Sequence, residues 1–186
     1  AQEKFYSSLE NNTQKSIHWK IYDERAYSLQ NLINFRERDG LSFGLDDNCY
    51  LNVTPEIYKQ YVDLLTEDFI LKNMNNKNIG NSPWNILHKG IYIDPNKLIN
   101  LVWFKYLSKS LDGVQMVQNF CEIGGGFGSF SDIIIRNYNI KLISIDLPEA
   151  NLLTAYYLKE IHPDKKFYLY DDYHKYKFLS LEDFEN

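Results

Sequence analysis

The chain has 186 residues, which allows one hydrophobic core of ordinary domain size, with or without a modest helical extension, and excludes two large domains. Hydrophobic residues make up 44% and charged residues 24%, a balance typical of folded globular proteins and unlike that of disordered chains. The formal net charge of -5 provides no cationic field, so neither nucleic acid nor a membrane surface is an expected partner.

The two cysteines, Cys49 and Cys121, lie far apart and belong to no metal-binding or redox motif. We therefore expect no disulfide framework, no metal site and a reducing, cytoplasmic setting. Cys121 stands in an apolar run and is expected to be a small buried side chain. No stretch approaches the roughly 18 apolar residues that span a bilayer, and the N-terminus lacks the layout of a signal peptide.

The first part of the chain, residues 1–112, is predicted to be a helical N-terminal region with polar loops. Asp23 is placed to cap a helix over residues 24–38. Thr54 followed by Pro55 is a second helix start, and the apolar spacing behind it predicts one helix to about residue 73.

The asparagine-rich segment 73–83 contains Gly80 and is predicted to be a loop. Asp94 and Pro95 then repeat the signal of a capping residue followed by proline. They predict a helix that ends near Gly113.

After Gly113, short apolar runs alternate with helical stretches, which is typical of βαβ units and a parallel sheet. The expected strands and helices alternate over residues 114–123, 129–138, 141–145, 148–161 and 166–170. The predicted fold class is therefore α/β, with a Rossmann-like parallel sheet over residues 113–186 behind the helical region.

A glycine-rich turn joins the first of these strands to a helix, an arrangement that brings backbone N–H groups and a helix N-terminus close to a polar ligand. Glu122 stands two residues before the first glycine. Asp146 ends the next strand, 18 residues after Gly128, the last glycine of the turn (146 - 128 = 18). At this place a carboxylate can accept hydrogen bonds from ribose hydroxyls. The glycines are Gly124, Gly125, Gly126 and Gly128.

Two features of the turn distinguish between cofactors. A dinucleotide fold prefers G-x-G-x-x-G, but Ser129 stands at the third glycine position. The carboxylate of Glu122 is unfavourable beside a pyrophosphate, whereas it suits the ammonium group of S-adenosylmethionine.

The run Glu-Ile-Gly-Gly-Gly-Phe-Gly at residues 122–128 resembles motif I of class I S-adenosylmethionine-dependent methyltransferases. The Asp-Leu-Pro-Glu segment at 146–149 and the Tyr-Tyr-Leu segment at 156–158 are similar to those of the sugar O-methyltransferase family. The resemblance implies an enzyme that transfers a methyl group from S-adenosyl-L-methionine to a hydroxyl of a small molecule, a sugar or glycoconjugate. Asp-Leu-Pro segments also occur in O-methyltransferases of phenolic compounds.

The resemblance also implies roles for individual residues. It places the methionine end of the donor at Glu122 and the glycine turn, the ribose at Asp146 and the adenine beside Leu147, with Asp171 or Asp172 near the adenine amino group. In this family the sheet continues beyond the third strand, so the sheet is expected to be incomplete in this chain.

No histidine stands in a motif that marks a catalytic base, and the catalytic residue is left unassigned. His88 is expected to be a surface or core residue. His162 precedes Pro163 at a predicted helix end, where the helix dipole favours it.

Two other functions stay open at this point. A nicotinamide-dependent oxidoreductase fits the general strand, turn and helix order. A non-catalytic module would use the helical N-terminal region to dock a partner or a second copy of the chain.

Overall fold

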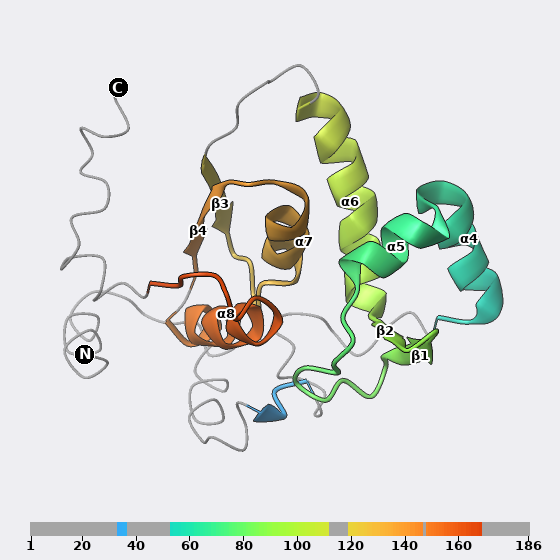
Figure 1. The fold of residues 1–186 in the computed structure, drawn as a ribbon, viewed down its shortest axis with the longest axis horizontal. Coiled ribbons are helices and arrows are strands. Elements are labelled where there is room, and N and C mark those ends of the chain that lie inside the picture. The colour runs from blue at the N-terminus through green and yellow to red at the C-terminus, as the bar shows by residue number, and fades with distance from the viewer. Residues whose placement is uncertain (1–32, 37–52, 112–118, 147, 169–186) are drawn as a thin grey trace, which may run out of the picture.

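The computed structural model describes residues 33–36, 53–111, 119–146 and 148–168. Over these residues the architecture is mixed α/β, with five helices and two small sheets (Figure 1). None of the helices in these ranges is long and apolar enough to cross a membrane. The elements in chain order are α4 (Pro55–Leu65), α5 (Glu67–Asn73), β1 (Ile86–His88), β2 (Ile91–Ile93), α6 (Pro95–Leu111), β3 (Asn119–Ile123), α7 (Ser129–Asn137), β4 (Lys141–Ile145) and α8 (Pro148–Ile161).

Of the three helix starts predicted in the front half, those at Thr54 and Asp94 are confirmed, and Asp23 lies outside the described residues. The side chain of Thr54 accepts a hydrogen bond from the backbone N–H of Ile57 at 3.3 Å. Asp94 Oδ1 accepts one from the N–H of Asn96 at 3.0 Å. Each cap satisfies a backbone donor that the first turn of a helix leaves without a partner.

The single helix predicted from Pro55 to about residue 73 is wrong, because Thr66 divides it into α4 and α5. Thr66 has φ 71° and ψ 144°, which no helix can continue. Its N–H donates to Val62 O at 2.8 Å, and its hydroxyl accepts from Phe69 N at 3.4 Å. One threonine thus ends α4 and begins α5.

A β-hairpin that the sequence analysis did not predict follows α5. Strands β1 and β2 pair in antiparallel fashion around Lys89 and Gly90, whose φ values are 51° and 77°. Positive φ at both central residues is typical of the tight turns that join hairpin strands. Each strand has only three residues, which is too short to show a clear alternation of apolar and polar positions.

The α/β unit of the second half is confirmed over β3, α7, β4 and α8, and β3 pairs with β4 in parallel. Both helices lie on the same face of this pair. The ring of Phe120 on β3 packs against Phe130 of α7, and the hydroxyl of Ser144 on β4 donates to Asn151 of α8 at 3.2 Å.

The opposite face of the β3–β4 pair is open within the described residues. Ile123 is 80% exposed and Ile145 is 51% exposed. Cys121 lies on this face and is exposed, so the prediction that it is buried is wrong. Alternate residues of a strand point to opposite faces, and Cys121 points away from α7.

Two predicted elements lie largely outside the described residues. Of the helix predicted over 24–38, only residues 33–36 are described, and they form a helical residue followed by a turn. Of the strand predicted over 166–170, residues 166–168 are described and irregular. The structure therefore shows the parallel pair with its helices but no complete Rossmann-like sheet.

The main hydrophobic core contains side chains from both halves of the chain. Leu98 and Leu101 of α6 pack with Ile133 and Ile134 of α7, and all four are fully buried. Isoleucine is a modest helix former, so this packing decides that the β-branched run in α7 is helical.

A buried carboxylate joins helices α6, α7 and α8. Asp132 of α7 is fully buried and forms an ion pair with Lys97 of α6. It also accepts hydrogen bonds from Arg136 at 2.8 Å and from His162, at the end of α8, at 2.7 Å. Burial opposes ionisation of Asp132, but His162 and the two cations lower its pKa to about 2.

This contact adds to the interpretation of His162. The residue does follow the last turn of α8, with its N–H bonded to Leu158 O at 2.8 Å. Its ring, however, is bonded to the Asp132 carboxylate, a long-range partner that a helix-dipole argument does not reveal.

We expect Asp132→Ala to lower the free energy of unfolding by about 3–5 kcal/mol, because it leaves Lys97 buried without a counter-charge. Denaturant titration measures the change. Asp164→Ala, at an exposed acid, is the matched control. A loss below about 1 kcal/mol for Asp132→Ala would contradict the role of this cluster.

The unfolding free energy should also depend on pH through Lys97, whose burial lowers its pKa to about 8 from 10.5. Between these two values the unfolded chain binds a proton that the folded chain has released, so rising pH favours the folded state. We expect the unfolding free energy of the wild type to rise relative to that of Lys97→Met from pH 8 to pH 10.5. A difference that stays constant over this range would contradict the shifted pKa.

Candidate functional site

The glycine turn between β3 and α7 has an unusual backbone. Gly124, Gly126 and Gly128 have φ values of 74°, 61° and 90°, a region that favours glycine. The N–H of Gly124 donates to the carbonyl of Ile145 at 2.9 Å, which ties the start of the turn to the end of β4. The turn thus lies at the carboxyl ends of both parallel strands.

At two glycines of the turn, an added Cβ would lie too close to a neighbouring side chain of the protein itself. A Cβ at Gly125 would lie 2.7 Å from the side chain of Glu122, and one at Gly128 would lie 2.9 Å from Cγ2 of Thr154. A Cβ at Gly124 would meet open space, so the positive φ is what favours glycine there.

Two carboxylates lie at the turn, one near the end of each strand. Asp146 Oδ2 accepts a hydrogen bond from the N–H of Gly126 at 2.8 Å. Glu122 accepts one from the hydroxyl of Ser131 on α7. Burial raises the pKa of Glu122, Ser131 opposes that rise, and the charge of Asp146 adds to it. Two acids at one turn favour a cationic ligand.

Two side chains of helix α8 donate hydrogen bonds to the backbone at the turn and at the end of β4. The hydroxyl of Thr154 donates to Gly126 O at 2.7 Å, and Asn151 Nδ2 donates to the backbone carbonyl of Asp146 at 3.0 Å. The sequence analysis did not single out Thr154 or Asn151. The sequence feature that could have identified them is a pair of polar residues three positions apart on a helix whose other inward positions are apolar.

The front half also contacts the turn. The guanidinium of Arg36 lies 4.8 Å from the ring centre of Phe127 and forms a two-pronged, buried ion pair with Asp94 at 2.7 and 3.0 Å. Asn100 of α6 donates to the hydroxyl of Ser129, the first residue of α7, at 3.2 Å. Arg36 falls within the helix predicted over residues 24–38, but no role was predicted for it.

The structure brings together most of the residues predicted to hold a cofactor. Glu122, the four glycines and Asp146 form one site at the N-terminus of α7. Leu147, Asp171 and Asp172 lie outside the described residues.

The described histidines are bonded to acids outside the turn. His88 Nε2 lies 2.9 Å from Glu67 Oε1, and His162 contacts Asp132. Neither contact provides a catalytic base at the glycine turn.

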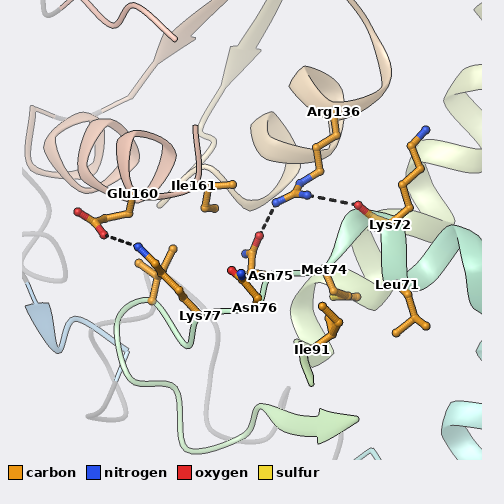
Figure 2. A pocket seen from close by; sticks show the side chains of 11 residues that line it. Leu71, Lys72, Met74, Asn75, Asn76, Lys77, Ile91, Arg136, Glu160 and Ile161 are labelled. Atoms are coloured by element: carbon orange, nitrogen blue, oxygen red, sulfur yellow. Dashed lines mark hydrogen bonds and ion pairs between the residues drawn. The ribbon is translucent and has the colours of Figure 1, made fainter. Parts of the chain in front are cut away.

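A depression of about 360 Å³ lies elsewhere, beside the C-terminal ends of α7 and α8 (Figure 2). Its charged side chains are engaged within the chain: Arg136 donates to Lys72 O and to Asn75, and Lys77 pairs with Glu160 at 3.6 Å. The depression is lined by none of the predicted cofactor residues, so it is a separate feature.

Comparisons with known proteins do not identify the chain: no family model, no curated protein and no solved structure matches it. Any function of this chain must therefore be inferred from the residues of the turn and their geometry.

Gly128→Ala should destabilise the protein more than Gly90→Ala. Both glycines have positive φ, which costs alanine about 1–2 kcal/mol, but only Gly128 has a neighbour in the way. Adding Thr154→Ser removes the Cγ2 methyl and keeps the hydroxyl, so it should restore part of the loss in Gly128→Ala alone. Thermal or denaturant unfolding measures both; equal losses without recovery would contradict the close contact.

Proposed function

We propose that this protein is an S-adenosylmethionine-dependent O-methyltransferase that acts on a hydroxyl of a small molecule, a sugar or glycoconjugate. One observation carries the proposal: the Glu122 and Asp146 carboxylates lie at the ends of adjacent parallel strands, around a glycine turn that opens a helix. Ligands of open α/β sheets bind at this edge of the strands.

The charges at the turn support this donor over a nicotinamide dinucleotide. The methionine end of S-adenosylmethionine has an ammonium group beside a sulfonium, and both are attracted by carboxylates. A pyrophosphate would be repelled by Glu122. Ser129 also replaces the third glycine of the dinucleotide pattern.

The residues present fit the donor. In the proposal Glu122 accepts hydrogen bonds from its ammonium group and Asp146 from its ribose hydroxyls. The positive end of α7 suits the donor's carboxylate. When bound, the donor supplies a methyl group on sulfur, and the protein's part is to align an acceptor hydroxyl with that methyl.

The choice of a sugar acceptor is supported by the resemblance of residues 146–149 and 156–158 to the sugar O-methyltransferase family. A Rossmann-like sheet, incomplete in this chain, and a cytoplasmic setting belong to the same proposal. The parallel β3–β4 pair and the two cysteines without a disulfide motif support them.

Isothermal titration calorimetry tests the proposal. We expect the wild type to bind S-adenosylmethionine and S-adenosylhomocysteine and not NAD. Glu122→Gln and Asp146→Asn should each weaken binding by about tenfold or more, since each removes a charged hydrogen-bond acceptor. Asp63→Asn, at an exposed acid of α4, is the control and should bind as the wild type does.

Two outcomes would contradict the proposal. Binding of NAD without heat from S-adenosylmethionine or S-adenosylhomocysteine would favour an oxidoreductase. Binding of none of these molecules by a folded protein would favour a non-catalytic module.

A further inference from the structure

We propose that Ser131 is a positioning residue of the donor site, whose hydroxyl holds the Glu122 carboxylate in one orientation at the glycine turn. Its link to donor affinity rests on the function proposed above. Ser131 acts through Glu122, because its hydroxyl donates to the carboxylate and no contact with a ligand is required.

The geometry confines the Glu122 carboxylate between two elements. The Ser131 hydroxyl reaches Oε2 from the first turn of α7, nine residues further along the chain. On another side, a Cβ at Gly125 would lie only 2.8 Å from the same oxygen. The absence of a side chain at Gly125 therefore makes the room, and Ser131 supplies the donor.

Ser131 is fully buried. A buried hydroxyl without a partner costs free energy, so the bond to Glu122 also stabilises the native conformation of α7. If the role of Ser131 were purely structural, removal of its hydroxyl would change stability alone. The chemistry of Glu122 adds a second consequence that can be measured separately.

The environment of Glu122 favours its neutral form in two ways and its ionised form in one. Burial raises the pKa of Glu122, and the charge of Asp146 at the end of β4 raises it further. The hydrogen bond from Ser131 on α7 lowers it. Removal of the hydroxyl therefore raises the pKa of Glu122, and a protonated Glu122 loses its attraction for an ammonium group.

The chain offers a matched control on the same helix. Ser129 is also a buried serine of the first turn of α7, but its hydroxyl is bonded to Asn100 of α6 and not to Glu122. Ser129→Ala removes a comparable buried hydrogen bond and leaves the Ser131–Glu122 bond in place.

The first measurement is the affinity for S-adenosylhomocysteine from about pH 5 to pH 8, a range that covers a raised carboxyl pKa. We expect Ser131→Ala to bind about tenfold more weakly than the wild type at the acid end and to approach it at the alkaline end. Ser129→Ala should follow the pH profile of the wild type. A loss of affinity in Ser131→Ala that is the same at every pH, or no loss, would overturn the inference.

The second measurement needs no ligand. Carbon-13 NMR follows the titration of the Glu122 carboxyl in the wild type and in Ser131→Ala, with Glu122→Gln identifying its signal. We expect a higher pKa in Ser131→Ala, and equal pKa values would overturn the inference. If the pKa rises as expected but the wild type binds no donor, the function proposed above fails while the role of Ser131 in the charge of Glu122 stands.

Discussion

The Asp132 carboxylate is the constraint on which the arrangement of the described helices depends. It is fully buried and bonded to Lys97 of α6, to Arg136 of its own helix and to His162 at the end of α8. Removing Asp132 leaves Lys97 in an apolar interior without a counter-charge, so alternative positions of these helices are strongly disfavoured. Because α7 is fixed against both neighbours, the position of its N-terminus and of the glycine turn before it is fixed as well.

Two adjacent residues of helix α7 belong to two different polar networks. Successive positions of an α-helix are about 100° apart around its axis, so Ser131 and Asp132 point in different directions. Asp132 reaches the buried cations, whereas Ser131 reaches Glu122 at the turn. The same turn of helix therefore anchors the fold and orients the acid at the proposed donor site, and the Arg36–Phe127 contact links that site to the front half.

Short-range signals in the sequence were sufficient for much of the second half. The predicted ranges 141–145 and 148–161 coincide with β4 and α8, and 129–138 exceeds α7 by one residue. Helix caps, prolines and glycine turns act over a few residues, so they can be read without the fold. The convergence of Glu122 and Asp146 also followed from the sequence, because adjacent parallel strands end at the same edge of a sheet.

Long-range contacts decided the features that the sequence concealed. The break at Thr66 separates α4 from α5, a result that helical spacing alone does not indicate. The exposure of Cys121 depends on which face of β3 the helices cover. The sequence by itself determined the order of most elements and the acids and glycines of the turn, through local backbone preferences. Only the tertiary structure decided the partners of Asp132, Ser131 and Arg36, because a buried polar group is satisfied by whatever segment folding brings beside it.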